Sequence, residues 1–174
     1  MINLRYFSLL FSFLIVSVAS AEPPNIQTPA PVIYLSDNLD EADGLGWCID
    51  TMGRGFGENL HAHSCKPRGG DVQFSYDAAS GQITSVPFEG KCMELIAPED
   101  TKIAFGLRDC SSGRASQQFK FDPASGQITP AHHPQSCVSA GATSRRAGPF
   151  MSRDLLLSPC AQVAAELSTW VVRN

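Results

Sequence analysis

The sequence predicts an all-β fold built from three similar units, and two features of the 174-residue chain carry this prediction. The first is a repeated segment: FSYDAASGQIT at 74–84 and FKFDPASGQIT at 119–129 are identical at eight of eleven positions. The second is the spacing of six cysteines, because Cys65 precedes Cys110 by 45 residues and Cys92 precedes Cys137 by the same distance. A fixed period of this length is typical of a chain made from repeated supersecondary units.

Each unit is expected to contain four short strands separated by turns. An apolar strand opens the unit, a second strand carries the first cysteine, a third ends in the second cysteine, and an aromatic strand closes it. The opening residues are Ile33, Ile83 and Ile128, and the closing aromatics are Phe74, Phe119 and Trp170. Turn formers such as the Ser-Gly pairs at 80–81 and 125–126 lie between the strands. Short, evenly spaced strands with such turns indicate a barrel or sandwich.

The two ends of the repeat predict how the units close. The sequence stops soon after Trp170, so unit three lacks the strand that follows the aromatic residue in units one and two. Residues 32–35 form one apolar strand in surplus at the other end. We expect this strand to complete unit three and leave few unpaired edges. Three four-stranded units closed around a pseudo-threefold axis make a β-trefoil.

The repeat also predicts how the cysteines pair. Six cysteines allow fifteen pairings, and the repeat selects the one that joins equivalent strands within each unit. The predicted disulfides are Cys48–Cys65, Cys92–Cys110 and Cys137–Cys160, with separations of 17, 18 and 23 residues. A zinc site is disfavoured because no two cysteines lie two to four residues apart. We expect the longer third separation to hold an insertion in which Arg145 and Arg146 lie on a solvated loop.

Composition limits the function classes. The chain has 13 Lys and Arg against 17 Asp and Glu, and charged residues make up 17% of it, below the roughly 25% of an average soluble protein. This balance excludes a disordered polyelectrolyte, a coiled coil and a nucleic-acid binder held by a strongly basic surface.

The N-terminus predicts export. Arg5 precedes an apolar stretch at 6–18, and the small residues 19–21 suit a signal peptidase. Residues 1–21 are therefore predicted to be a signal peptide, with a retained anchor as the alternative. The Pro-rich segment 22–31 is predicted to be an extended linker, and 32–174 the folded domain. We expect a secreted or periplasmic protein without a transmembrane segment.

From about residue 32 to residue 172 the chain resembles the ricin-type β-trefoil lectin domain. Cys48-Ile49-Asp50 matches the Cys-x-Asp motif of that family, and Gln117-Gln118-Phe119 matches its Gln-x-Trp motif with Phe in place of Trp. The equivalent segments Val72-Gln73-Phe74 and Ser168-Thr169-Trp170 lack the motif glutamine.

The resemblance implies a sugar site made of an acid, a stacking ring and a polar residue at the ring edge. In unit one these positions are Asp50, His63 and Asp71. His61, two residues before His63 on a presumed strand, faces the same side and is expected to reach the ligand too. The equivalent positions are Glu94, Arg108 and Ser116 in unit two, and Ser139, Ser158 and Leu167 in unit three. The resemblance therefore implies one weak site for galactose-like or N-acetylgalactosamine-like residues, in unit one. Asp71 near Asp50 needs a compensating cation, for which Arg54 and Arg68 are the candidates.

Other interpretations stay open beside this one. A degenerate trefoil that binds a protein partner would resemble the targeting subunits of cytolethal distending toxin, and a trefoil protease inhibitor of the Kunitz type is a third class. His61 and His63 would share a face if they bound a metal, but no metal or other cofactor is expected. The sequence lacks a Gly-x-Ser-x-Gly elbow, a phosphate-binding loop and a His-Glu-x-x-His motif, so we expect a binding protein rather than an enzyme.

Overall fold

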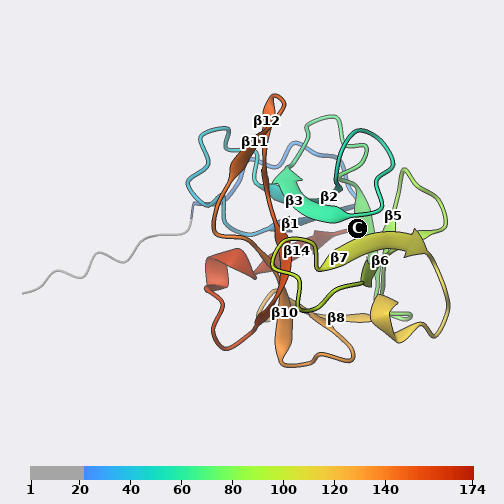
Figure 1. Ribbon diagram of the computed structural model, residues 1–174. Coiled ribbons are helices and arrows are strands. Elements are labelled where there is room, and N and C mark those ends of the chain that lie inside the picture. The colour runs from blue at the N-terminus through green and yellow to red at the C-terminus, as the bar shows by residue number, and fades with distance from the viewer. Residues whose placement is uncertain (1–21) are drawn as a thin grey trace, which may run out of the picture.

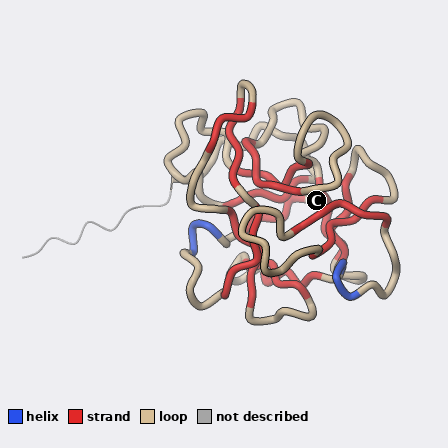
Figure 2. Tube along the Cα trace, in the orientation of Figure 1, coloured by secondary structure: helices blue, strands red, loops and turns tan. Residues whose placement is uncertain are grey.

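The computed structural model describes residues 22–174, which fold into fourteen strands and two single-turn 3-10 helices (Figures 1 and 2). The predicted signal peptide lies outside the described residues. Unit one contains β1 (Val32–Leu35), β2 (Trp47–Thr51), β3 (Leu60–Ser64) and β4 (Phe74–Asp77). Unit two contains β5 (Gln82–Ser85), β6 (Lys91–Leu95), β7 (Phe105–Asp109), η1 (Ala115–Gln117) and β8 (Phe119–Asp122). Unit three contains β9 (Gln127–Pro130), β10 (Ser136–Ala140), β11 (Arg145–Ala147), β12 (Phe150–Arg153), β13 (Leu155–Pro159), η2 (Ala165–Leu167) and β14 (Trp170–Arg173).

Strand pairing follows the predicted threefold pattern and confirms the β-trefoil. Within the units, antiparallel pairs join β2 to β3, β6 to β7, and β10 to β13. Between the units, β4 pairs with β5, β8 pairs with β9, and β14 pairs with β1. The last of these pairs runs from Val32 opposite Arg173 to Leu35 opposite Trp170. The N-terminal strand thus completes unit three, as the repeat predicts.

The repeated segments form two equivalent hairpins. In the first, Asp77 Oδ1 accepts the N–H of Ala79 and Oδ2 accepts the hydroxyl of Ser80. Asp122 makes the same two bonds in the second hairpin, with Ala124 and Ser125. Gly81 and Gly126 both have φ +72°, a conformation that residues with a Cβ rarely adopt. The Asp and Gly of the repeat therefore serve the turn geometry.

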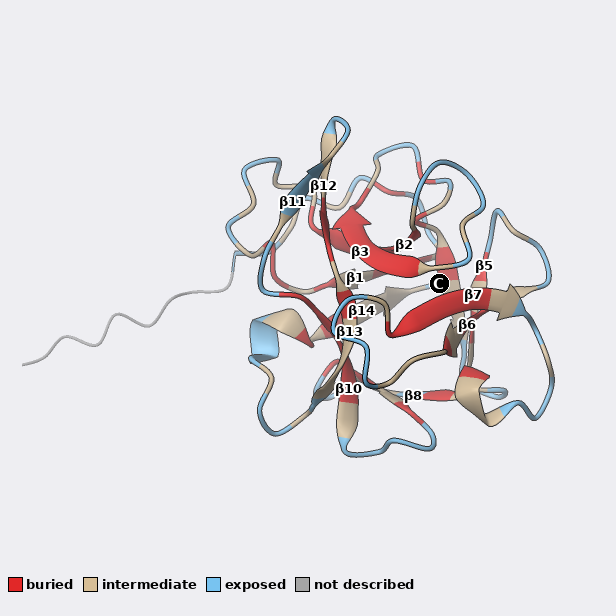
Figure 3. Cartoon of the chain, in the orientation of Figure 1, coloured by how far each residue is buried: buried red, intermediate tan, exposed pale blue. Residues whose placement is uncertain are grey.

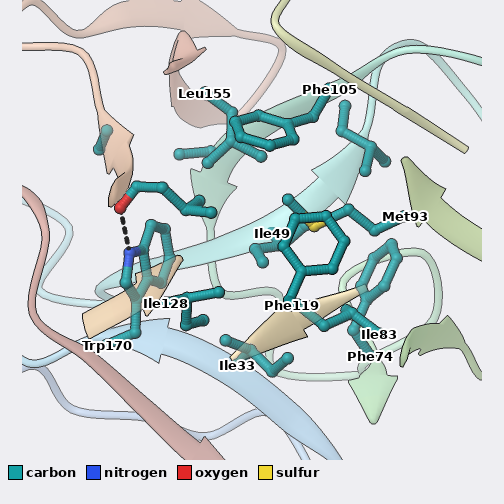
Figure 4. Close-up of a cluster of buried hydrophobic side chains, with 14 of the residues drawn as sticks. Ile33, Ile49, Phe74, Ile83, Met93, Phe105, Phe119, Ile128, Leu155 and Trp170 are labelled. Atoms are coloured by element: carbon teal, nitrogen blue, oxygen red, sulfur yellow. Dashed lines mark hydrogen bonds between the residues drawn. The ribbon is translucent and has the colours of Figure 1, made fainter. Parts of the chain in front are cut away.

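The predicted core residues meet around the pseudo-threefold axis (Figure 4). All six of them are at most 3% exposed: Ile33, Ile83, Ile128, Phe74, Phe119 and Trp170. Trp170 differs from the two phenylalanines because its indole N–H donates to the carbonyl of Val138 at 2.8 Å (Figure 4). The buried indole group is thereby satisfied.

The three predicted disulfides are present, with one in each unit: Cys48–Cys65, Cys92–Cys110 and Cys137–Cys160. No free cysteine remains in residues 22–174. Disulfides of this kind persist in oxidising compartments, so the three pairs favour an extracytoplasmic protein.

The Pro-rich segment 22–31 differs from the predicted linker because it packs against the domain. Thr28 is 1% exposed, and its hydroxyl donates to the carbonyl of Lys66 at 2.8 Å. The guanidinium of Arg173 donates to the carbonyl of Thr28. Ile26 packs on an apolar cluster around the Cys48–Cys65 pair. These contacts fix the segment beside unit one.

The insertion in unit three exposes Arg145 and Arg146 to solvent, as expected, but it forms a strand where we expected a loop. Arg145 and Arg146 lie on β11, which pairs with β12. On its other side, β12 pairs with β3 of unit one. The resulting six-stranded sheet has the order β11-β12-β3-β2-β1-β14. Figure 1 shows the hairpin projecting at the top of the molecule, and Figure 3 shows β11 exposed while β2 and β3 are buried. The hairpin gains its stability from the edge of β3.

Candidate functional site

The unit-one residues singled out by the sequence lie together on one face of the β2–β3 pair. Asp50 stands opposite His61 in the register of the two strands. His61 and His63, two residues apart on β3, have ring centroids 5.3 Å apart. Asp50 Oδ2 lies 3.7 Å from His61 Nε2 and 3.6 Å from His63 Nδ1. Asp50, His61 and His63 therefore lie on the same face of the sheet, as predicted.

The cation of this cluster is Lys66, which sequence reasoning missed. Its ammonium lies 2.8 Å from Asp50 Oδ2 and 2.6 Å from Asp71 Oδ1, so it bridges the two carboxylates. The expectation that Arg54 or Arg68 would take this part is wrong, because both side chains are exposed and form no ion pair with either acid. The only signal in the sequence was the position of Lys66 directly after Cys65, from which a four-carbon side chain reaches back over β2.

Three of the four predicted site residues are more buried than a shallow sugar site requires. Asp50 is 1% exposed, His61 7% and His63 5%. Phe150 of the β11–β12 hairpin lies edge-on against His63, with ring centroids 5.6 Å apart. The ring predicted as a stacking platform is thus covered by another ring of the same chain. Lys66 and Asp71 are the most exposed members of this cluster, with side chains 20% and 17% exposed.

Electrostatics keep the cluster charged. Burial raises the pKa of the Asp50 carboxyl, but the contacts with His61 and Lys66 outweigh it, so the pKa lies below its ordinary value. Burial lowers the pKa of Lys66, and the bonds to Asp50 and Asp71 more than reverse this, so the pKa is raised. Both carboxylate partners of Lys66 therefore favour its charged form.

His63 is held neutral beside these charges. Burial is the largest cause that lowers the pKa of His63 below its ordinary value. Its Nδ1 lies 2.9 Å from the carbonyl oxygen of Ser64, which can only accept, so this nitrogen carries the proton of the neutral ring. The proton of His63 thus points at the backbone and not at Asp50.

In unit two, the side chains at the equivalent positions form hydrogen bonds with other residues of the chain. Glu94 accepts from the amide of Gln117 at 2.7 Å and from the hydroxyl of Ser116 at 3.0 Å. Burial raises the pKa of Glu94, but these bonds and the nearby Arg114 bring it below the ordinary value. Arg108, at the position of the stacking ring, donates to the carbonyl of Glu58 at 2.6 Å.

Unit three has neither an acid nor a ring at these positions. The hydroxyls of Ser139 and Ser158 lie 2.7 Å apart and bond to each other. Leu167, at the polar position, is part of η2. The unit therefore keeps the scaffold without the groups that recognise hydroxyls.

Two kinds of feature are absent from residues 22–174. Within this range, no group of three or more His, Cys, Asp or Glu is arranged to hold a metal ion. In the same part of the chain, no helix is long and apolar enough to cross a membrane.

Comparison with solved structures identifies three proteins of similar fold. A crystal structure of GalNAc-T7 with UDP, GalNAc and Mn2+ matches with a TM-score of 0.53 and 16% identity, over 87% of this chain and 23% of that chain. The cytolethal distending toxin of Actinobacillus actinomycetemcomitans matches with a TM-score of 0.54 and 17% identity, over 82% of this chain and 90% of that chain. The solution structure of the mdaA-1 domain matches with a TM-score of 0.54 and 15% identity, over 87% and 92% of the two chains. At these identities the likeness shows the fold alone.

Comparison of the sequence identifies the family. No curated protein matches the chain. The family model described as the ricin-type beta-trefoil lectin domain matches residues 38–166. This match spans most of the chain and includes all six cysteines of the three disulfide-linked units. The chain belongs to the ricin-type β-trefoil lectin family, whose domains are carbohydrate-binding modules.

Proposed function

We propose that this protein is a secreted or periplasmic lectin that binds galactose-type or N-acetylgalactosamine-type residues through unit one. Membership of a carbohydrate-binding family and three disulfides support the proposal. The observation that carries it is the Lys66 bridge at the family's sugar position, where an ammonium group joins two carboxylates. Paired donors and ionised acceptors are the groups that recognise sugar hydroxyls most strongly.

The burial of the cluster divides its residues between two roles. Lys66 and Asp71 reach solvent, so they are the groups that contact the sugar in this proposal. Asp50 lies behind them and fixes Lys66 through the 2.8 Å contact. His61 and His63 fill the face beside Asp50. A site that offers only Lys66 and Asp71 and no exposed aromatic ring binds weakly, because the apolar face of the sugar stays in water.

The charge state of Asp50 favours binding over hydrolysis. Cleavage of a glycosidic bond needs one carboxyl group that holds a proton near neutral pH. Asp50 and Asp71 both contact the ammonium of Lys66, and the pKa of Asp50 is lowered. Because the contacts with His61 and Lys66 outweigh burial and lower the pKa of Asp50, this carboxyl lacks the proton that a general acid would donate, and the proposal is a lectin that is not an enzyme.

A glycan array on residues 22–174 tests the function, and titration calorimetry of the best ligand tests the site. Asp71→Asn removes one acceptor charge while Asp50 still holds Lys66, and we expect about tenfold weaker binding. The matched control is Asp109→Asn, because Lys91 and Asp109 form another Lys–Asp pair at 2.6 Å, with Asp109 90% exposed. Equal affinities of the wild type and the Asp71→Asn variant would contradict the unit-one site.

A second candidate function is binding of a protein partner by a trefoil that has lost sugar recognition. The observation that favours it is the absence of an open ring at the three stacking positions: His63 is buried under Phe150, and the other two residues are Arg108 and Ser158. The toxin structure of similar fold adds no functional evidence at 17% identity. An array without signal, together with a complex of fixed stoichiometry with one defined second chain, would support this candidate. A monomer with a reproducible glycan profile would count against it.

A further inference from the structure

The junctions between consecutive units follow one plan. Each is bordered by the loop after the second strand of one unit and by the loop after the first strand of the next. Between units one and two, these loops bring Phe56 against Phe88, with ring centroids 5.3 Å apart. Between units two and three they border a cavity of about 370 Å³, and between units three and one a cavity of about 600 Å³. The larger of the two cavities thus lies beside η2, where the last unit meets the first.

Arg153 of β12 lines the larger cavity and is 6% exposed. Its Nη1 donates to the carbonyls of Gly141 at 3.1 Å and Ala142 at 2.7 Å, and its guanidinium lies over the ring of Trp47 at 4.5 Å. Its Nε has no hydrogen-bond partner among residues 22–174, and its Nη2 lies 3.9 Å from the nearest acid, Glu41. The guanidinium is therefore fixed in place. Its Nε is enclosed by protein, whereas Nη2 forms no hydrogen bond among residues 22–174 and is the donor left for a ligand oxygen.

The walls of the cavity carry more negative than positive charge. Three acids line it, against the single cation Arg153: Asp37, Asp40 and Glu166. The remaining lining residues are small, hydroxyl-bearing or aliphatic: Ser36, Leu39, Ala142, Ala165, Leu167 and Thr169. In contrast, the cavity between units two and three contains no acid, and its lining consists of Leu95, Pro98, Ala115, Ser116, Pro130, His132 and His133.

This cavity is separate from the unit-one cluster. In the register of β12 and β3, Arg153 stands opposite Ala62, whereas Ser152 stands opposite His63. Because side chains alternate along a strand, Arg153 and the two histidines lie on opposite faces of the same sheet. A ligand in the cavity therefore does not share a surface with Lys66 and Asp71.

We propose that the cavity between units three and one binds an amino sugar with a free ammonium group. The three carboxylates attract the ammonium group and accept hydrogen bonds from it, while the fixed Arg153 donates to a hydroxyl oxygen. The aliphatic walls cover C–H groups of the sugar ring. A neutral or N-acetylated sugar satisfies Arg153 but leaves the excess negative charge uncompensated, so the cavity discriminates by charge. This second site extends the proposed lectin function but uses none of the residues of the unit-one cluster, namely Asp50, His61, His63, Lys66 and Asp71.

Calorimetric titration of residues 22–174 with the glucosamine disaccharide, and with its N-acetylated counterpart, tests the proposal. We expect the free amine to bind at least about tenfold more tightly, since each charge-assisted bond contributes about that factor. Asp40→Asn and Glu166→Gln, both at exposed residues, should each weaken binding of the free amine by about tenfold. Glu99→Gln, at an exposed acid outside the cavity, should leave it unchanged.

The same titrations distinguish this site from the unit-one site. Asp71→Asn should not alter binding of the glucosamine disaccharide, whichever way the galactose-type ligand behaves. The junction site is overturned if the free amine does not bind, if the N-acetylated sugar binds as tightly, or if neither Asp40→Asn nor Glu166→Gln weakens binding. Loss of amine binding in Asp71→Asn alone would also overturn it, because the ligand would then lie at unit one.

Discussion

Phe150 of unit three lies edge-on against His63 of unit one, with ring centroids 5.6 Å apart. The two residues are 87 positions apart in sequence and meet because β12 pairs with β3. The contact covers the ring that the family pattern assigns to sugar stacking. Unit three therefore limits how far His63 of the unit-one cluster is exposed to solvent.

Removing Phe150 should change the titration of His63. In Phe150→Ala the ring of His63 gains contact with water, and because burial is the main cause of its lowered pKa, the pKa should rise toward 6.5. NMR titration of the histidine ring protons measures this shift. Phe56→Ala, which removes a 47% exposed ring from another loop, is the control and should leave His63 as it is. An unchanged pKa in Phe150→Ala would show that other groups keep this ring dry.

Lys66 should be essential to stability because it compensates buried Asp50. Lys66→Met leaves the Asp50 carboxylate, 1% exposed, without its cation, and we expect a loss of about 3–5 kcal/mol in the free energy of unfolding. Lys91→Met, at a pair whose acid is 90% exposed, should cost at most about 1 kcal/mol. Urea denaturation measures both values. If Asp50→Asn is added to Lys66→Met, much of the loss should be recovered, and a double variant no more stable than Lys66→Met would contradict the assigned pairing.

Stability should decline on the acid side of neutrality. The pKa of His63 is lowered in the fold from 6.5, so the unfolded chain takes up this proton first and the free energy of unfolding falls as the pH drops below about 6.5. The contribution of Asp50, whose pKa is lowered from 3.8, is present above that value and is lost as the pH falls through the folded pKa. Comparing the thermal unfolding of the wild type and His63→Asn across this pH range isolates the contribution of His63 to stability. His133→Asn, at an exposed histidine, is the control, and a wild-type curve that is flat from pH 6.5 to 5 would refute the assignment.

The disulfides should differ in how much each contributes to the free energy of unfolding. Each closes a loop of 17 to 23 residues, for which chain entropy gives about 3 kcal/mol. Cys48 and Cys65 are both fully buried in an apolar cluster with Val32 and Val72, whereas Cys160 is partly exposed. Replacing Cys48 and Cys65 by Ala should therefore destabilise the protein more than replacing Cys137 and Cys160, although the latter loop is longer. Denaturation of the two double variants decides the order.

The fold was predictable because the signals for it are local and repeated. The Asp and Gly of the two hairpins specify their turns, and Ile33, Ile83 and Ile128 recur at the same place in each unit. The pairing of β1 with β14 also followed, since the repeat leaves one strand over at one end and one missing at the other.

The environment of the candidate site was not predictable in the same way. Spacing placed Asp50, His61 and His63 on one face, but the ring of His63 is covered by Phe150, which comes from a distant part of the chain. Arg145 and Arg146 carry no strand signal of their own and become a strand through the free edge of β3. Lys66 occupies no motif position, and its role follows only from where its flexible side chain ends.

The six-stranded sheet also has a consequence for synthesis of the chain. Its order places β3, β2 and β1, from the first 64 residues, between β12 on one side and β14 on the other. Until the ribosome has passed residue 150, β3 presents an open edge, and β1 stays unpaired on its other side until residue 173 has emerged. Exposed strand edges recruit other chains. The strands of residues 32–64 therefore lack a neighbour on each side, and keep two open edges, until the strands at 150–153 and 170–173 have been made.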